Sequence, residues 1–290
     1  MHPLTDDEKK AVRRYLKADS RRGDPTADLF DGAEGLAVIL PEENCILSGI
    51  EVMVYLFSEL SCSLEFRKGA VSGAEWSEGE PIAHVHGAVP DLLRGERVAL
   101  NIISRMSGVA TAAGRASKIA EEASPGTRVA GTRKTTPGFN LFEKRALIDG
   151  GALPHRYDLS SMAMIKDNHL SSLGNGPNAV KEAVRRIREI YGPYLKIEVE
   201  IEDIDCAIAA VDAGAEIIMI DNRSPEECAF FSEALRKRAS DLGREVTLEA
   251  SGGITLETIP EYAPHVDVIS MGSLTEGYRP IGFKMEMDLD

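Results

Sequence analysis

In the first third of the chain, the pattern of apolar and polar residues changes over short segments, each of which predicts one helix or strand. Residues 5–20 begin with a threonine and three acidic residues and continue with basic ones, which predicts a capped helix with a favourable dipole. The apolar stretch 36–40 predicts a strand, and residues 51–57 predict a helix after a Ser-Gly turn. Residues 63–66 and 82–89 alternate at period two, which is typical of half-buried antiparallel strands. We therefore expect this region to be of the α+β class.

A long helix is expected next, over residues 97–122, because apolar residues recur there at helical spacing. Gly108 and Gly114 lie in its middle, and they permit either close packing against a neighbour or a break in the helix. After this helix the pattern changes to apolar strands that alternate with helices. We therefore place the boundary between two domains inside it, near residues 105–115.

Six apolar strands separated by helical patterns follow the boundary. The strands are expected at residues 128–131, 162–166, 195–200, 216–221, 246–250 and 266–270. The helices are expected at residues 178–191, 203–213, 225–242 and 255–262. Regular alternation of apolar strands with helices predicts a parallel sheet that is covered by helices.

The parallel sheet could be an open doubly wound sheet or a barrel. No G-x-G-x-x-G motif follows any of the strands, so a dinucleotide-binding fold has no support. Five strands end at polar residues, and the active sites of (β/α) barrels are built from these carboxyl ends. The residues are Lys166, Glu200, Asp221, Ser251 and Ser270. Only six strands are readable, so we expect the barrel to be incomplete.

Glycine loops follow the last two strands of the predicted barrel. They contain Ser251-Gly252-Gly253 and Ser270-Met271-Gly272. Such loops present backbone N–H groups to a phosphate, and barrels commonly bind phosphate after their last two strands.

The charge of the chain changes the picture in one place. The formal net charge is −14, which argues against binding to nucleic acid. Yet residues 133–169 contain six Lys or Arg, four Asp or Glu and two His, a composition that suggests a site for a small anion. Lys144 and Arg145 fall inside a helix, where solvation of a helix face explains them. The pairs Arg133-Lys134 and His155-Arg156 fall where the patterns break, and they are better explained by a ligand.

Composition also bears on location. No apolar run approaches the ~18–20 residues of a transmembrane helix, and the acidic N-terminus does not resemble a signal peptide. Four widely spaced cysteines without a C-x-x-C motif are expected to be free thiols in a reducing cytoplasm. His84 and His86 share a strand face and could form a metal pair. No third ligand lies nearby in the sequence, so a solvated strand face is favoured.

Several motifs together resemble the quinolinate phosphoribosyltransferase family over nearly the whole chain. The strongest are Gly131-Thr132-Arg133-Lys134-Thr135-Thr136-Pro137-Gly138, His155-Arg156 and Ile165-Lys166-Asp167-Asn168-His169. Glu198-Val199-Glu200, Ile220-Asp221-Asn222 and Ser251-Gly252-Gly253-Ile254 complete the pattern. A single T-R-K motif would be weak evidence, but this series in the right order is highly specific.

The resemblance implies an α/β protein with two domains. These are an N-terminal α/β-sandwich (α+β) domain over residues 1–110, with a C-terminal return over 275–290, and an incomplete (β/α) barrel over 111–274. It also implies a homodimer, in which one subunit covers the barrel mouth of the other. The implied enzyme is a glycosyltransferase of NAD biosynthesis. With Mg²⁺, it joins quinolinate to phosphoribosyl pyrophosphate and releases nicotinate mononucleotide, pyrophosphate and CO₂.

The resemblance assigns roles to residues that match its motifs. Arg133 and Arg156, with His155 beside them, would bind the quinolinate carboxylates, since guanidinium suits bidentate carboxylate recognition. Arg97 would reach the neighbouring subunit's active site. The lysines Lys134 and Lys166 would lie between the two substrates, and Glu200 and Asp221 would bind Mg²⁺ or ribose hydroxyls. The remaining predicted contacts, which include the phosphate loops, are Thr132, Ser251, Gly252, Gly253, Ser270 and Gly272.

Other residues near these motifs receive supporting roles. We expect His169 to cap or orient its loop, and Glu198, deeper on the strand than Glu200, to support a lysine. Trp76 and His265 are interpreted as structural. The family commonly has three glycines before its His-Arg pair, whereas here Gly150-Gly151-Ala152 is followed by Leu153-Pro154, which puts fine substrate preference in question.

Three other functions fit parts of the sequence. Lys166 on a barrel strand could form a Schiff base, as in an aldolase. A homologue of the same fold could take nicotinate or serve molybdenum metabolism. A regulatory subunit without activity would leave the cationic residues unexplained.

Overall fold

The computed structural model describes residues 3–30 and 32–288, which group into two compact units. The first unit comprises the described residues up to Gly114, then Thr135–Gly151, and those from Leu274 onward. The second comprises Arg115–Lys134 and Ala152–Ser273. The domain bounds inferred from the sequence stay a prediction. They assigned residues 135–151 to the barrel, whereas contacts group this segment with the first unit.

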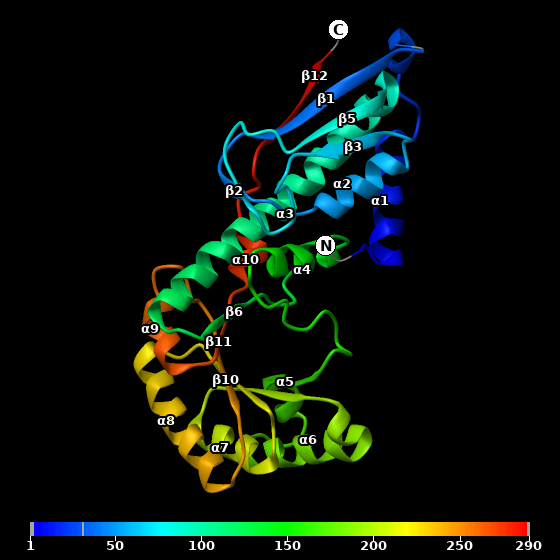
Figure 1. Cartoon of the computed structure of the whole chain (residues 1–290). Coiled ribbons are helices and arrows are strands. Elements are labelled where there is room, and N and C mark those ends of the chain that lie inside the picture. Colours follow the sequence, from blue (N-terminus) through cyan, green and yellow to red (C-terminus); the bar gives the residue numbers. More distant parts are fainter. Residues whose placement is uncertain (1–2, 31, 289–290) are drawn as a thin grey trace. The chain divides into compact units, whose positions relative to one another are not determined.

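The first unit is built on an antiparallel sheet of four strands in the order β12-β1-β5-β3 (Figure 1). Their bounds are β1 (Glu34–Pro41), β3 (Ser63–Phe66), β5 (Ala83–Ala88) and β12 (Phe283–Asp288). A short pair, β2 (Cys45–Ile46) with β4 (Glu75–Trp76), was not predicted. The strands predicted at 36–40, 63–66 and 82–89 are confirmed. Because β12 pairs with β1, the C-terminal residues return to the sheet of the first unit.

Two helices of the first unit follow the predicted caps. Helix α1 (Asp6–Asp19) begins at Thr5, whose side chain accepts from the Glu8 backbone N–H while the Glu8 carboxylate accepts from Thr5. Helix α2 (Ile50–Ser58) begins after Gly49, as the Ser-Gly turn predicted. Both helices bury one apolar stripe, which includes Val12 and Leu16 of α1.

Helix α3 (Val89–Ala123) runs unbroken past both of its central glycines, so they serve close packing. A β-carbon at Gly114 would lie 2.2 Å from Ile46 Cδ1, and one at Gly108 would lie 2.6 Å from the Arg279 carbonyl oxygen. The helix therefore needs glycine at position 108, where the backbone of Arg279 approaches, whereas at position 114 the Ile46 side chain would have to move.

Helix α4 (Asn140–Asp149) shows that one expectation was wrong. Lys144 is only 1% exposed, and Arg145 forms a buried ion pair with Glu8 at 3.0 Å. Neither side chain solvates the helix face. The helix packs into the first unit, so the residues that looked like surface charges became part of its interior.

The second unit contains a parallel sheet of six strands in the order β6-β11-β10-β9-β8-β7. The strands are β6 (Arg128–Ala130), β7 (Ala163–Ile165), β8 (Ile197–Ile201), β9 (Ile217–Asp221), β10 (Thr247–Ser251) and β11 (Val268–Ser270). All six strands predicted from apolar runs are confirmed. Each lies within two residues of its expected bounds at either end.

Helices connect these strands, as Figure 1 shows. They are α5 (Asp167–Ser171), α6 (Gly176–Tyr191), α7 (Ile204–Ala213), α8 (Pro225–Asp241) and α9 (Ile259–Tyr262), with α10 (Ser273–Glu276) after β11. The helix predicted over 255–262 is shorter than expected. Residues 256–258 form a turn before the helix, in which the Thr255 carbonyl accepts from the backbone N–H groups of Thr258 and Ile259.

The strand order favours an incomplete barrel over a doubly wound sheet. In a doubly wound sheet the order reverses beside the first strand. Here β7 to β11 pair in sequence order, and the first strand, β6, pairs with the last, β11. The sheet remains open between β6 and β7, the two ends of the order. The fold class predicted from the sequence is therefore confirmed.

The pairing register places the polar strand residues on one face. Ser251 is the partner of Asp221, and Glu249 is the partner of Met219, which in turn pairs with Glu200. Register partners in a parallel sheet point to the same face, and so do residues two apart on one strand. Glu198, Glu200, Asp221, Glu249, Ser251 and Ser270 therefore share one face of the sheet.

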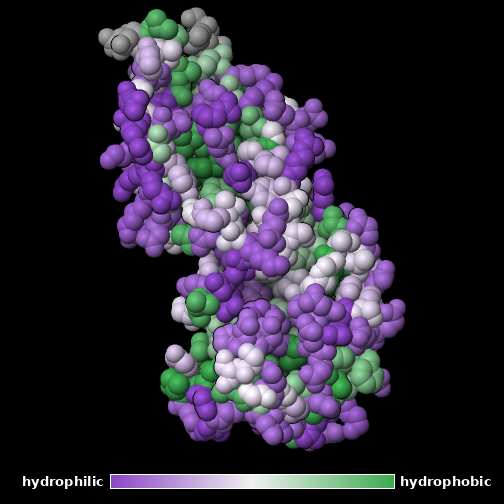
Figure 2. Space-filling view, turned by 180° about the vertical axis from the view of Figure 1, so that it is seen from behind, coloured by the Kyte–Doolittle hydropathy of each residue, from purple (hydrophilic) through white to green (hydrophobic). Residues whose placement is uncertain are grey.

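The visible surface is mainly hydrophilic (Figure 2). Large apolar side chains that are well exposed, such as Leu29, Ile190 and Tyr194, are scattered along the sequence. Among the described residues, every helix is too short or too polar to cross a membrane.

The Arg145–Glu8 pair gives a stability prediction. Burial raises the pKa of the Glu8 carboxyl, but hydrogen bonds from Arg145 and Thr5 lower it further, so the net pKa is lowered. Arg145→Met leaves a buried carboxylate without its cation, which is expected to cost about 3–5 kcal/mol of unfolding free energy. This loss should shrink as pH falls through the native pKa of Glu8, because the carboxyl is then protonated in both states.

The matched control is Arg185→Met, which removes an exposed arginine that pairs with Glu182 and Glu189 on helix α6. Surface pairs of this kind contribute about 0–1 kcal/mol. Urea unfolding at neutral pH compares the two variants. Equal losses would show that the Arg145–Glu8 pair does not stabilise the first unit.

Candidate active site at the carboxyl ends of the barrel strands

Lys166 and Glu200 form an ion pair at the carboxyl end of β7 and β8. The register explains the pair, because Met164 lies opposite Glu198 and the next rung on this face brings Lys166 opposite Glu200. The Lys166 side chain is partly exposed and the Glu200 side chain is mostly buried. A polar pair thus replaces apolar packing where the strands open toward solvent.

Asp221 ends β9 directly beside Ser251, its register partner on β10. One of its carboxylate oxygens accepts from the Asn222 side-chain amide at 2.7 Å. Asn222 has a positive φ of 53°, which turns the chain sharply after the strand. The carboxylates of Glu200 and Asp221 therefore share one face of neighbouring strands near their carboxyl ends.

The glycine loop after β10 fits closely against this turn. Gly252 and Gly253 have φ values of 98° and 64°. A β-carbon at Gly252 would lie 2.3 Å from Asn222 Oδ1 and 2.8 Å from the Asn222 backbone nitrogen. Only glycine fits at position 252, and the loop brings its backbone next to the residue that follows Asp221.

The segment before His155 extends the sheet by one rung beyond β6. Leu153 bridges to Ala130 in parallel, its N–H donates to the Val129 carbonyl, and its carbonyl accepts from Gly131. Pro154 favours this extended backbone in the residue before it. His155 follows with a φ of 55°, so its side chain leaves the rung in an unusual direction.

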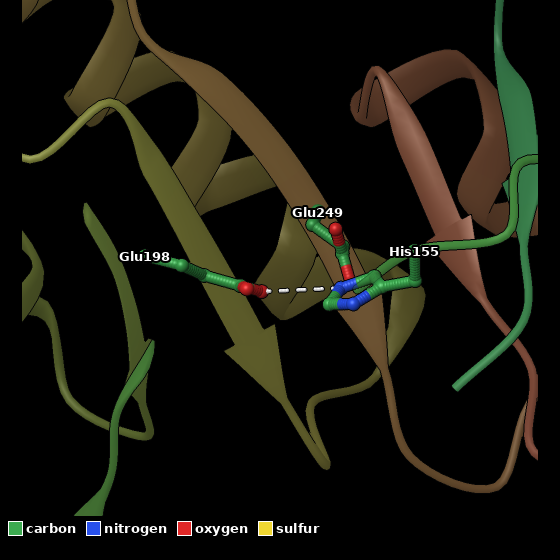
Figure 3. A group of neighbouring side chains, drawn as sticks. All are labelled: His155, Glu198 and Glu249. Atoms are coloured by element: carbon green, nitrogen blue, oxygen red, sulfur yellow. Dashed lines mark hydrogen bonds and ion pairs between the residues drawn. The ribbon is translucent and has the colours of Figure 1, made fainter. Parts of the chain in front are cut away.

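His155 meets two buried carboxylates (Figure 3). Its Nε2 lies 3.1 Å from Glu249 Oε1 and 3.6 Å from Glu198 Oε1. Burial lowers the pKa of His155, and the contacts with the Glu198 and Glu249 carboxyl groups raise it more, to about 9. We had expected from the sequence that Glu198 supports a lysine, and this expectation was wrong. Glu198 contacts His155, which comes from a segment far away in the sequence.

Glu249 was not identified from the sequence as a site residue. It lies within the apolar run Val246–Ala250, and its burial is the signal that could have marked it, because an acidic residue in a buried strand needs a partner. The Ser270 hydroxyl donates to the same Glu249 oxygen that faces His155. Glu249 therefore joins β10, β11 and the His155 segment.

Arg156 and Arg133 bring like charges close together. Arg156 is buried and its Nη2 lies 3.0 Å from Met164 Sδ, which sets the side chain against β7. Burial, and then the positive charge of Arg133, lower the pKa of the Arg156 guanidinium, while Glu198 and Glu200 oppose this. Two neighbouring guanidinium groups favour an anionic ligand that neutralises both.

Comparison with known proteins identifies the family. The model of the quinolinate phosphoribosyl transferase N-terminal domain matches residues 24–107, and that of the C-terminal domain matches residues 109–286. The chain belongs to the quinolinate phosphoribosyltransferase family. The resemblance seen in its motifs is thereby confirmed.

Relatives and solved structures of this family cover nearly the whole chain. Nicotinate-nucleotide pyrophosphorylase (carboxylating) from Dictyostelium discoideum is 39% identical over 292 residues, 96% of this chain and 95% of the relative. The Homo sapiens protein of that name is 40% identical over 90% of this chain and 85% of its own. The crystal structure of NadC from Streptococcus pyogenes has a TM-score of 0.90 at 29% identity, with both chains fully covered.

The structure places the other predicted family residues as follows. Thr132 and Lys134 follow β6, and the Thr132 hydroxyl accepts from the Lys134 backbone N–H at 3.0 Å. Ser270 is buried with its hydroxyl on Glu249, so the candidate phosphate donors of that loop are backbone groups near Gly272. Arg97 lies in the first unit on α3, where its exposed side chain contacts Glu96.

Residues expected to be structural behave accordingly. His169 Nδ1 accepts from the Lys166 backbone N–H at 3.0 Å and caps α5, as predicted. Trp76 is buried and its indole donates to the Glu80 carbonyl, while His84 and His86 are exposed. Ala152, where the family commonly has glycine, is buried, so its methyl group is packed.

The glycine loop gives a prediction. Gly252→Ala is expected to cost at least about 2 kcal/mol of unfolding free energy, because a positive φ and a clash with the Asn222 backbone act together. The control is Gly243→Ala, which has a φ of 63° but no atom within 4 Å of the added carbon. It is expected to cost about 1 kcal/mol from backbone strain alone. Thermal and urea unfolding measure both, and equal losses would contradict the close fit.

Proposed function

We propose that this chain transfers the phosphoribosyl group of phosphoribosyl pyrophosphate to quinolinate, with loss of pyrophosphate and CO₂. The product is nicotinate mononucleotide, a precursor in NAD biosynthesis. Family models match both halves of the chain, and the curated relatives at 34–40% identity carry the name nicotinate-nucleotide pyrophosphorylase (carboxylating). The chain is accordingly an enzyme of this class.

One observation supports the acceptor most directly, the gathering of three cationic side chains at one place in the barrel. Arg133 lies close enough to Arg156 that its positive charge, after burial, lowers the pKa of Arg156, and His155 directly precedes Arg156 with a pKa raised to about 9. Quinolinate carries two adjacent carboxylates on a planar ring. Planar guanidinium groups bind such carboxylates through paired hydrogen bonds, which a single lysine does not provide.

The donor fits the other side of the same strand ends. Backbone N–H groups of Ser251–Gly253, and of the residues up to Gly272, would hold the 5′-phosphate, as glycine loops after the last barrel strands do. The carboxylates of Glu200 and Asp221 would accept hydrogen bonds from ribose hydroxyls. Lys134 and Lys166 would lie between donor and acceptor, where negative charge on pyrophosphate develops.

Glu200 and Asp221 also fit Mg²⁺. Both are carboxylates near the carboxyl ends of adjacent strands, and Mg²⁺ usually takes one or two protein carboxylates with substrate phosphate oxygens. The Lys166 contact of Glu200 and the Asn222 contact of Asp221 fix the orientation of both carboxylates. When bound, Mg²⁺ would neutralise charge on the leaving pyrophosphate.

The chain's own residues would act by position and charge. Arg133, Arg156 and His155 would hold quinolinate so that its ring nitrogen faces the anomeric carbon of the donor. As the bond to pyrophosphate breaks, lysine would stabilise the departing charge and the ring nitrogen would form the new C–N bond. The resulting pyridinium stabilises the electron pair left on its second carbon when the 2-carboxylate departs as CO₂, and a proton from water forms the new C–H bond there. No covalent enzyme intermediate is needed.

We also propose a homodimer in the cytoplasm, in which Arg97 serves the neighbouring active site. Arg97 is an exposed arginine at the surface of its own unit, where it pairs with the adjacent Glu96. The four cysteines are buried free thiols, which is typical of proteins in a reducing compartment. The net charge of −14 does not favour nucleic acid as a partner.

The other functions are less well supported. Human nicotinic acid phosphoribosyltransferase has a TM-score of 0.58 at 12% identity, a similarity of fold alone. A Schiff-base role needs a neutral Lys166, whereas Lys166 is paired with Glu200. Family membership and the cationic residues favour the dicarboxylate over nicotinate, a molybdenum-linked role or a regulatory subunit.

The product assay tests the proposed function. Purified protein with quinolinate, phosphoribosyl pyrophosphate and Mg²⁺ is expected to form nicotinate mononucleotide and CO₂ in equal amounts. Chelation of Mg²⁺ should abolish both products. Turnover of nicotinate in place of quinolinate would overturn the acceptor assignment, and silence with both would overturn the function.

Two substitutions test the residue roles. Arg133→Ala and Lys166→Ala are each expected to lower kcat/KM for quinolinate by at least about 100-fold, because each removes a charge that acts on bound substrate. The control is Arg236→Ala. Arg236 is exposed and pairs with Asp267 directly before β11, at the amino ends of the strands and away from the candidate site. This substitution should change kcat/KM less than about twofold. Normal activity in a folded Arg133→Ala or Lys166→Ala enzyme would remove that residue from the mechanism.

A further inference from the structure

A histidine can bind a substrate without acidic neighbours, yet His155 forms a cluster with Glu198 and Glu249. One ligand atom from each residue lies within 4.8 Å of the others. The three side chains come from different places, β8, β10 and the segment after Leu153, and Figure 3 shows both carboxyl groups beside the same ring nitrogen. The barrel therefore brings two carboxyl groups to one nitrogen of a single histidine.

The two carboxylates are buried, and both contact His155. Glu198 is 0% exposed, and among the described residues neither of its oxygens has a hydrogen-bond partner; its ion contact is with His155. The Glu249 carboxylate is also fixed by Ser270, whose hydroxyl donates to the oxygen that faces His155. Buried carboxylates without cationic partners are costly, so the cluster favours a positive charge on the imidazole.

This arrangement decides what the second nitrogen of His155 can do. Nε2 faces carboxylate oxygens, so it must carry a hydrogen. If the ring were neutral, Nδ1 would hold a lone pair and would repel a substrate carboxylate. If the ring is an imidazolium, Nδ1 carries a hydrogen and donates. The two glutamates thus determine whether Nδ1, the other ring nitrogen, accepts or donates a hydrogen bond.

The charged groups that act on His155 come from several elements. Glu198 on β8 and Glu249 on β10 favour the imidazolium, and together with the opposing effect of burial they raise the pKa to about 9. Arg156, on the same segment, acts on Glu198 and in turn lies in the fields of Arg133 and Glu200. The acidic neighbours prevail, so the ring stays charged at neutral pH.

We propose that Glu249, supported by Ser270 and Glu198, is a positioning residue that keeps His155 an imidazolium, whose Nδ1–H donates to one carboxylate of the pyridine dicarboxylate substrate. This inference rests on the proposed function and adds to it. Glu249 would not touch the substrate. Its negative charge would keep His155 positively charged, and His155 would in turn bind the negatively charged substrate.

The test is Glu249→Gln, which keeps an oxygen toward Nε2 and removes the charge. The pKa of His155 should then fall toward its ordinary value of about 6.5. At pH 8 the imidazolium fraction would drop, and KM for quinolinate should rise roughly 30-fold, since each pH unit above the pKa lowers that fraction about tenfold. KM for phosphoribosyl pyrophosphate should change less than about twofold.

The pH profile separates this role from a structural one. Wild-type KM for quinolinate should be flat from pH 6.5 to 8 and should rise as pH passes about 9. The Glu249→Gln profile should rise from about pH 6.5, and the two enzymes should converge near pH 6, where both imidazoles are charged. The control is Glu216→Gln, an acidic residue outside the cluster that pairs with Arg188, and its profile should match wild type.

A second measurement does not depend on how the variant folds. Wild-type protein with ¹⁵N-labelled histidine should show both His155 nitrogens protonated from pH 6 to 8, with the signal assigned through His155→Gln among the six histidines. A neutral His155 in this range would overturn the proposal. So would a stoichiometric divalent metal ion that metal analysis finds in wild-type protein and not in Glu249→Gln.

The outcomes also separate this proposal from the proposed function. If wild-type enzyme forms nicotinate mononucleotide but Glu249→Gln shows an unchanged KM for quinolinate at pH 8, only the positioning role fails. If wild-type enzyme does not turn over quinolinate, the proposed function fails, and the substrate contact of Nδ1 fails with it. The NMR titration then still decides whether the cluster holds an imidazolium.

Discussion

Burial of acidic side chains inside a parallel sheet is the constraint on which this active site depends. Glu198 and Glu249 lie on buried strands, on the same face as Glu200 and Asp221. Isolated carboxylates in such a place would take up protons or destabilise the fold. Cations delivered from other segments compensate them, His155 for the deeper pair and Lys166 for Glu200. The stability of the barrel and the charge of the site are thus parts of one arrangement.

The open side of the barrel supplies the most important of these cations. Because β6 and β7 do not pair in the described sheet, the edge of β6 is available to another segment. Leu153 takes it with a single rung, and the chain then turns through Pro154 into the left-handed backbone of His155. An eight-stranded closed barrel would place a strand at this position. The incomplete barrel uses it for the segment that carries His155 and Arg156, the two residues proposed to bind quinolinate.

The two substrates would make opposite demands on the site, and the sheet separates them. A dicarboxylate needs cations, which come from the segments beside β6 and from the start of α5. A ribose with its phosphates needs hydroxyl acceptors and backbone donors, which come from β8, β9 and the glycine loop after β10. Gly252 fits closely against Asn222, so the loops that follow β9 and β10 approach each other there. Lys166, paired with Glu200, lies where the two groups of residues meet.

The sequence by itself determined the elements, the fold class and the family. Apolar spacing located all six barrel strands, since each strand's periodicity is a local property, and the order of the T-R-K, H-R and K-D-N-H motifs identified the family. The tertiary structure alone decided the partners of buried charges. Lys144 and Arg145 looked like surface residues, Glu198 looked like a lysine partner, and Glu249 attracted no attention. Their roles depend on which distant segment arrives beside them in a low-dielectric interior, and no local pattern of residues records that.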